Sequence, residues 1–226
     1  SAKIYIDATG SGNLSVLCGC DWECGDPAEG RPSPISTGAC LVGFPKDYDG
    51  TSGHEEKFEH WRLLAEHGFA PSSESIPVTK LPSLATWDMS ANFEYDVMPD
   101  DIVALSRSAI GGRSDAFKAA EAHRKVEGCE NIYNVFTSSH VGIREGRRIF
   151  GEYRITDDDI IEGRRFDDGI CLVTFGVDVH KLKPDDTTEC ARGYKTKPYH
   201  IPYRALLPKK CDNLILAGRC LSGDFY

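Results

Sequence analysis

The two ends of the chain share one pattern, a short apolar run that small residues and glycines interrupt. The first run predicts a core strand over 3–8, and D-A-T-G-S-G follows at 7–12. The second run, N-L-I-L-A at 213–217, leads into G-R-C-L-S-G-D. Apolar runs of this kind are typical of buried parallel strands, and glycines let the chain turn tightly where such a strand ends. We therefore expect the two strands to lie side by side and parallel in one sheet, which a long insertion interrupts.

Between these ends, apolar residues at helical spacing predict two amphipathic helices, at 54–67 and 115–127. Gly68 is placed to end the first helix. Ser114 is placed to cap the second, and Gly128 to end it. Shorter patterns predict a helix at 13–19, strands at 38–44, 92–97, 132–136 and 170–179, an extended segment at 199–204, and a capping box that begins at Thr156.

These elements predict an α/β fold with an α+β insertion. Residues 1–35 and 206–226 are expected to share a partial parallel sheet. Residues 36–205 are expected to form a separate domain, built on a mostly antiparallel or mixed sheet with both predicted helices on one face. A chain of 226 residues, 40% of them hydrophobic, can bury a core as one large domain or two small ones.

Charge and hydropathy narrow the classes of partner. The chain has 26 Lys and Arg against 35 Asp and Glu, a net charge of −9. Such a balance disfavours nonspecific binding to nucleic acid phosphates and to anionic lipid. No apolar run approaches the roughly 18 residues of a membrane helix. We expect neither a nucleic acid nor a membrane partner and a cytoplasmic location, although the start at Ser1 leaves room for a targeting segment upstream.

The nine cysteines do not form the pattern of a disulfide framework. Their count is odd and they are spread along the chain, so we expect reduced thiols. Cys18, Cys20 and Cys24 form C-x-C-x-x-x-C, which could seed a metal site. A four-ligand zinc site usually pairs two Cys or His halves, however, and small thiols also pack a helix as alanines do. We favour packing and assign no metal ligand, and elemental analysis for zinc and iron would test this.

Positive charge is concentrated after the strand predicted at 132–136. The segment 140–149 reads H-V-G-I-R-E-G-R-R-I. On a helix or tight turn, His140 and Arg144 would be neighbours on one face because they are four residues apart. The residues alone allow two interpretations of this segment. It is an active-site segment, or its cations form surface ion pairs with carboxylates such as Glu145 and Glu152.

Five sequence blocks together resemble a known family. They read D-A-T-G-S-G at 7–12, G-I-R-E-G-R-R-I at 142–149, E-G-R-R-F at 162–166, I-P-Y-R at 201–204 and N-L-I-L-A-G-R-C-L-S-G-D at 213–224. In this order they resemble the FAD-dependent oxidoreductases, whose two-part fold is similar to those of glutathione reductase and the flavin hydroxylases. The resemblance covers most of the chain. It implies an FAD-binding domain from 1–35 and 206–226, and a substrate domain from 36–205.

The resemblance also implies roles for particular residues. In such enzymes the flavin transfers the electrons, and the protein positions the flavin and orients the substrate. On the cofactor side, the matching positions are Thr9, Gly10, Gly12, Gly218, Arg219 and Asp224.

On the substrate side, the resemblance implies His140 for proton transfer near neutral pH, a role that histidine side chains commonly have. It implies Arg144 and Arg204 for orienting oxygen atoms or holding the negative charge of a reduced flavin. The expected activity is electron transfer from a small polar organic substrate to FAD. A homo-oligomer is left open.

One departure from the family matters. The family opens with a strand, G-x-G-x-x-G and a helix, and no G-x-G-x-x-G occurs in this sequence. That motif normally holds the pyrophosphate through backbone N–H groups and a helix N-terminus. We therefore expect this chain to be a fragment that lacks both this unit and the flavin-facing C-terminal helix, to retain FAD weakly and to be inactive alone. A non-catalytic domain and a metal-binding domain with the same fold remain alternatives. A serine hydrolase does not, because no G-x-S-x-G is present.

Overall fold

The computed structural model describes residues 2–73, 76–82, 84–184 and 196–225. The fold is a mixed α/β fold with several small sheets. It divides into two compact units: Ser1–Ser33 with Arg144–Tyr226 form unit 1, and Pro34–Ile143 form unit 2. The predicted middle segment, 36–205, extends over unit 2 and much of unit 1. Its role as a substrate domain stays a prediction.

Unit 1 contains the two predicted terminal strands. β1 (Tyr5–Asp7) pairs in parallel with β10 (Leu214–Leu216), so that Asp7 lies opposite Leu216. The predicted parallel pairing is thus confirmed. α1 (Asn13–Leu17) follows the turn after β1 and ends earlier than predicted. A small buried cluster supports this layer, with Cys20, Ile149, Leu214, Leu216 and Cys220.

The remaining elements of unit 1 are short. β2 (Trp22–Glu23) pairs antiparallel with β7 (Arg148–Ile149), and β8 (Gly169–Val173) with β9 (Tyr199–Pro202). A 3-10 helix, η1 (Tyr203–Leu206), follows β9. α4 (Asp157–Glu162) begins at the predicted capping box, in which Thr156 Oγ1 accepts from Asp159 N and the Asp159 carboxylate accepts from Thr156 N. That prediction is confirmed.

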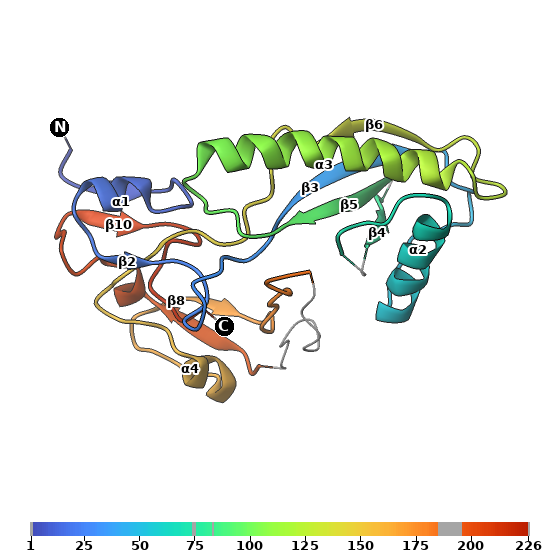
Figure 1. The fold of residues 1–226 in the computed structure, drawn as a ribbon. Coiled ribbons are helices and arrows are strands. Elements are labelled where there is room, and N and C mark those ends of the chain that lie inside the picture. The colour runs from blue at the N-terminus through green and yellow to red at the C-terminus, as the bar shows by residue number, and fades with distance from the viewer. Residues whose placement is uncertain (1, 74–75, 83, 185–195, 226) are drawn as a thin grey trace. The chain divides into compact units, whose positions relative to one another are not determined.

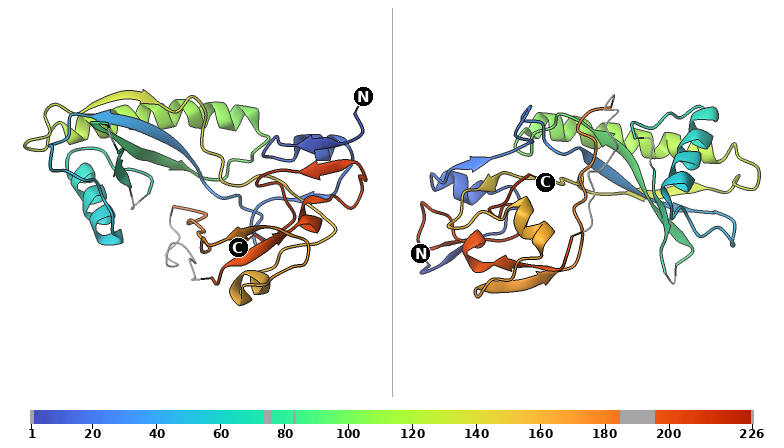
Figure 2. Two further views of the ribbon diagram at one scale, coloured as in Figure 1. Left: turned by 180° about the vertical axis from the view of Figure 1, so that it is seen from behind. Right: turned by 90° about the horizontal axis from the view of Figure 1, so that it is seen from below.

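Unit 2 is built on one antiparallel sheet of four strands. Their order is β4 (Val78–Lys80), β5 (Thr86–Glu94), β3 (Ile35–Val42) and β6 (Tyr133–Thr137). α3 (Ile102–His123) runs along this sheet and contacts β3, β5 and β6 (Figures 1 and 2). α2 (His54–Glu66) forms where the pattern predicts it. The strand predicted at 92–97 is displaced, because β5 lies earlier in the chain and Asp96 turns with φ 57°.

α3 is longer than its sequence pattern predicts. The cap predicted at Ser114 is wrong: the helix begins at Ile102, and the side chain of Asp101 accepts from Val103 N at 3.0 Å and Ala104 N at 2.9 Å. The helix continues through Gly112 because this face meets the sheet. A Cβ at Gly112 would lie 2.1 Å from Thr37 Oγ1, so only glycine permits this close approach. Tertiary packing here outweighs the low helix propensity of glycine.

Two histidines are buried together in the core of unit 2. His123 Nδ1 lies 2.6 Å from the Ala119 carbonyl, and His123 Nε2 lies 2.9 Å from His60 Nε2. A carbonyl only accepts, so His123 carries its proton on Nδ1 and accepts from His60 at Nε2. Burial lowers the pKa of His60 to about 3 and that of His123 to about 4. Both rings are therefore neutral at neutral pH.

Candidate functional site

The turn after β1 is shaped by a buried carboxylate. Asp7 is fully buried and accepts hydrogen bonds from Thr9 Oγ1 at 2.6 Å and Ser15 Oγ at 2.6 Å, and from both backbone N–H groups. Burial alone would raise the pKa of Asp7, but the hydrogen bonds from Ser15 and Thr9 outweigh it and lower the pKa. Thr9 Oγ1 also accepts from Asn13 N at 2.8 Å. The hydroxyl of Thr9, a predicted cofactor contact, therefore holds the turn together.

The glycines of this turn allow close contacts within the protein. Gly10 and Gly12 have φ angles of 77° and 66°, which residues other than glycine rarely adopt. A Cβ at Gly12 would lie 2.8 Å from Ile149 Cδ1, and one at Gly10 would lie 2.7 Å from Arg219 Nη2. The space beside both glycines is thus occupied by side chains of unit 1. Arg219 is the neighbour that a bound molecule could displace, since its guanidinium ends a flexible side chain.

The basic block of the sequence packs directly on the same turn. A Cβ at Gly146 would lie 2.5 Å from the Gly10 carbonyl oxygen, so the two backbones touch. Arg147 is 7% exposed, and its Nε donates to the Ser11 carbonyl at 2.8 Å. Its guanidinium also donates to Asn13 Oδ1. Arg147 was not among the site residues predicted from the sequence. The signal was present as two arginines directly after a glycine, in an otherwise acidic chain.

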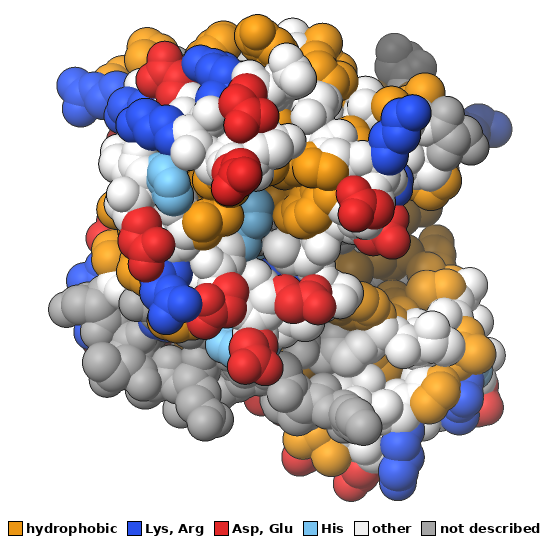
Figure 3. Space-filling view, turned by 90° about the vertical axis from the view of Figure 1, so that its right-hand side faces the viewer, with side chains coloured by type: hydrophobic (Ala, Val, Ile, Leu, Met, Phe, Trp, Pro, Cys, Tyr) orange, Lys and Arg blue, Asp and Glu red, His pale blue; other side chains and the backbone are white. Residues whose placement is uncertain are grey.

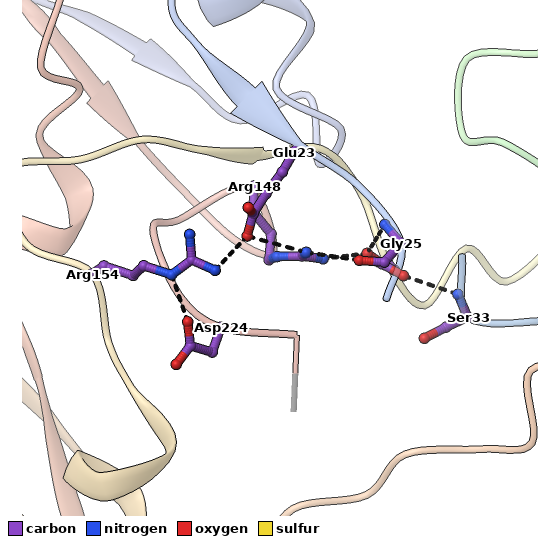
Figure 4. Close-up of polar contacts among 7 residues, drawn as sticks. Glu23, Gly25, Ser33, Arg148, Arg154 and Asp224 are labelled. Atoms are coloured by element: carbon purple, nitrogen blue, oxygen red, sulfur yellow. Dashed lines mark hydrogen bonds and ion pairs between the residues drawn. The ribbon is translucent and has the colours of Figure 1, made fainter. Parts of the chain in front are cut away.

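A network of charged side chains connects three distant segments of unit 1 (Figure 4). The buried Arg148 donates to Glu145, to Glu23 at 3.3 Å and to the Gly25 carbonyl at 3.0 Å. Arg154 bridges Glu23 at 2.6 Å and Asp224 at 2.5 Å. The predicted cofactor contact Asp224 is therefore fixed by an arginine.

Glu145 completes this network as the second carboxylate bound by Arg148. Its two carboxylate oxygens accept from Gly25 N at 2.7 Å and Ser33 N at 2.9 Å (Figure 4). One carboxylate thus holds both ends of the loop 25–33. The ion pair predicted as an alternative for this block exists, but its cation is Arg148.

A pocket of about 220 Å³ lies beside this network. It is lined by Ser33, Arg144, Glu145, Arg148, Asp178, Val179, His180, Arg219 and Phe225. Burial and then the positive charge of Arg144 lower the pKa of His180. The pocket brings together Arg144, which the family resemblance assigns to the substrate side, and Arg219, which it assigns to the cofactor side.

The structure does not place His140 and Arg144 on one helix face. Residues 140–147, all of them described, contain no helix, because the backbones of Ser36 and Gly142 pair in an isolated β-bridge. His140 belongs to unit 2 and is exposed, with its Nδ1 2.9 Å from Ser139 Oγ, whereas Arg144 belongs to unit 1. A shared role for the two residues stays a prediction.

Arg204 lies in a separate ion pair. Its Nε and Nη2 contact the two oxygens of Asp168 at 2.9 and 3.2 Å, and its guanidinium lies 5.2 Å from the ring of Tyr153. The side-chain hydrogen bonds from Arg204 lower the pKa of Asp168. This pair ties η1 to the loop before β8, and a substrate role for Arg204 stays a prediction.

Other classes of site find no support in the described residues. Eight cysteines there are free thiols, and Cys190 lies outside the described residues. Within the ranges that the structure describes, no group of three or more His, Cys, Asp or Glu is arranged to hold a metal ion. None of the described helices combines the length and apolar character needed to span a bilayer. The face in Figure 3 mixes carboxylates, cations and apolar side chains.

The edge that β1 and β10 share fits a large, anionic organic cofactor. Gly218 follows β10 with φ 93°, and a Cβ placed there would meet no atom within 4 Å. Backbone at this turn is therefore open to close approach by a ligand. Arg219 follows directly and supplies a cation beside Gly10. FAD needs both features, close backbone approach and positive charge near its phosphates or reduced ring.

Comparisons with known proteins agree with this fit. A family model described as FAD dependent oxidoreductase matches residues 1–226. No curated protein and no solved structure matches significantly. The match spans the whole chain, including both glycine turns and the basic block. The chain belongs to the family of FAD-dependent oxidoreductases, and the cofactor of that family is FAD.

Proposed function

We propose that this protein transfers electrons from a small polar organic substrate to FAD, and that the shared edge of β1 and β10 faces the cofactor. One observation carries the proposal: parallel pairing brings the turns at 9–12 and 218–224 to the same edge. In parallel sheets, ligands bind at the carboxyl ends of strands. When bound, FAD supplies the electron-accepting ring.

The residues of this chain would then hold and orient FAD. The open backbone at Gly218 lets the cofactor approach closely, and Arg219 offsets negative charge. Asp7 keeps the first turn in one conformation through Thr9 and Ser15. Asp224, held by Arg154 at 2.5 Å, provides a fixed acceptor for a cofactor hydroxyl. Preorganised groups of this kind lower the entropic cost of binding.

The three residues predicted for the substrate side differ in their surroundings. Arg144 lines the pocket beside Arg219, which supports a role near the cofactor. His140 is exposed and Arg204 is paired with Asp168, so neither gains support from its contacts. We keep both as candidates, to be tested by substrate reduction of the flavin in His140→Ala and Arg204→Ala.

The cofactor edge is tested by a pair of matched glycine variants. Gly218 and Gly128 both have positive φ, 93° and 83°, and neither has an atom within 4 Å of a Cβ position. Valine imposes similar backbone strain at both positions. We expect Gly218→Val to weaken FAD binding at least tenfold in a fluorescence titration, and Gly128→Val to leave it unchanged. Equal FAD affinities for the two variants, with equal thermal unfolding, would overturn the assignment of this edge.

A non-catalytic domain with the flavoprotein fold is the second candidate. The observation that favours it is the lack of G-x-G-x-x-G in the sequence. Both candidates predict that the purified chain carries little flavin, because the pyrophosphate loses its usual backbone donors. They differ once FAD is added: only the oxidoreductase allows a substrate to bleach the flavin absorption band. A stoichiometric flavin band in the purified chain would show that the residues present suffice for tight binding.

A further inference from the structure

The side chains that line the pocket beside the charged network of unit 1 carry one more positive charge than negative charges. Three arginines line it, Arg144, Arg148 and Arg219, against two carboxylates, Glu145 and Asp178. The one histidine there is neutral at neutral pH, since its pKa is lowered by burial. A bound monoanion would therefore neutralise the lining. A neutral molecule would leave the surplus charge in place.

Arg219 is the cation in this pocket that lacks a partner. Arg148 is engaged by Glu145 and by Glu23. Arg219 has no hydrogen-bond or ion-pair partner among the described residues, although it lies against Gly10. A guanidinium presents paired N–H donors that match the two oxygens of a carboxylate. The surplus charge is thus located on a group that is well suited to an oxyanion.

A second polar group in the same pocket has an unused donor. The Nε of Arg148 is buried and has no hydrogen-bond acceptor among the described residues. The ring of Phe225 covers this guanidinium, with its centroid 5.4 Å away. The lining therefore offers the guanidinium donors of Arg219 and an aromatic surface at Phe225. Such a lining suits a small organic acid better than a hydrated inorganic ion.

We propose that this pocket binds the carboxylate of a small monocarboxylic acid, with Arg219 as its main partner, and that this acid is the substrate of the oxidoreductase. The second part rests on the proposed function, whereas binding of the acid does not. Arg219 contacts both the turn at Gly10 and the pocket, so it would hold the acid next to the cofactor edge. A phosphate group of the cofactor presents similar chemistry. The experiment separates the two sources.

The experiment compares propionate with its neutral isostere propanamide on the purified chain, without FAD. Saturation-transfer NMR detects binding of each probe to the protein, and a titration of the probe concentration gives its affinity. Arg219→Gln removes the charge with little change of shape, and Arg144→Gln is the second variant. The matched control is Arg165→Gln, an exposed arginine of unit 1 outside the pocket lining. Thermal unfolding of each variant reports on its fold. Inorganic phosphate and FAD are titrated in parallel.

We expect propionate to bind and propanamide not to bind. Arg219→Gln should weaken propionate about tenfold to a hundredfold, the size of a charge-assisted contact. Arg165→Gln should have no effect. Failure of propionate to bind, or equal binding by Arg219→Gln, overturns the proposal even where FAD binds normally. Binding of phosphate but not propionate also overturns it and assigns the pocket to the cofactor. Binding of propionate without binding of FAD supports the pocket and contradicts the proposed function.

Discussion

The two units of this chain are stabilised by different means. Unit 2 has one continuous sheet, a long helix and an apolar core that includes Leu41, Met89 and Ala120. Among its described residues, unit 1 has three two-stranded sheets and a smaller core, and buried charged groups link its segments. An apolar core is stabilised in proportion to the apolar surface that it removes from water, and salt does not weaken it. A buried charged network is destabilised when any one of its members is removed, because the remaining charge is left without its partner. The proposed cofactor edge and pocket therefore lie in unit 1, the unit whose folded structure depends more on contacts between charged groups.

The largest difference between the two units is expected in the stability of each unit at acidic pH. His60 and His123 are neutral in folded unit 2, with pKa values of about 3 and 4 against 6.5 in an unfolded chain. Below pH 6.5 the unfolded chain binds protons that the folded unit does not. The free energy of unfolding should fall by on the order of 1.4 kcal/mol per pH unit for each histidine, down to about pH 4.

Asp7 gives unit 1 a different acid limit. Its folded pKa lies below the ordinary 3.8, so its contribution is retained above that value and lost only as pH falls further. Hydrogen exchange from pH 7 to pH 4 should therefore show unit 2 opening first, because it buries two neutral histidines, whereas among the described residues of unit 1 a lowered histidine pKa is found only at His180. Earlier opening of unit 1 would contradict the assignment of the buried histidines as neutral.

The next contrast is in the core of unit 2. Leu41 is fully buried on the central part of the sheet, and Leu41→Ala leaves a cavity there. We expect a loss of about 2 to 5 kcal/mol in the free energy of unfolding by urea. Leu84→Ala, at a leucine that is 60% exposed, is the control and should change it little. Similar losses in both variants would mean that Leu41 is not part of a packed core.

A smaller effect is expected in the charged network of unit 1. Glu145→Gln leaves Arg148 in place, and both side chains are only 10% exposed. We expect a loss of about 1 to 3 kcal/mol, because a buried cation loses its charged partner. Glu121→Gln, which removes the exposed partner of Arg124, should cost about 0.5 kcal/mol or less. Urea unfolding at low and high salt checks both. Equal costs would show that the network of unit 1 is no stronger than a surface pair.

Local signals in the sequence predicted local structure well. The strand runs at both ends and the capping box at Thr156 need only neighbouring residues to be recognised. The start of α3 was missed because Ser114 was taken as its cap, whereas the helix begins at Ile102 and continues through Gly112. Glycine suits the helix at Gly112 because Thr37, which is distant in the sequence, fills the space that a Cβ would occupy.

Site contacts between distant residues were harder to predict. Arg148 meets Gly25 across 123 residues, and His123 meets His60 across 63. Sequence spacing holds no signal for such pairs. Arg144 and Arg219 were selected through the family resemblance for different sides of the site, and the pocket contains both. The partner of Arg204 was not foreseen, because Asp168 meets it only where β8 and β9 pair.

The central claim is that the edge formed by the turns at 9–12 and 218–224 faces FAD. Hydrogen exchange of the chain with and without saturating FAD tests it most directly, because it reports on each backbone amide. The account predicts slower exchange at Gly10 and at Gly218 and Arg219, with no change in the sheet of unit 2. Protection from exchange that is confined to unit 2 would contradict the claim. So would equal exchange with and without FAD, measured at an FAD concentration at which quenched flavin fluorescence shows that FAD is bound.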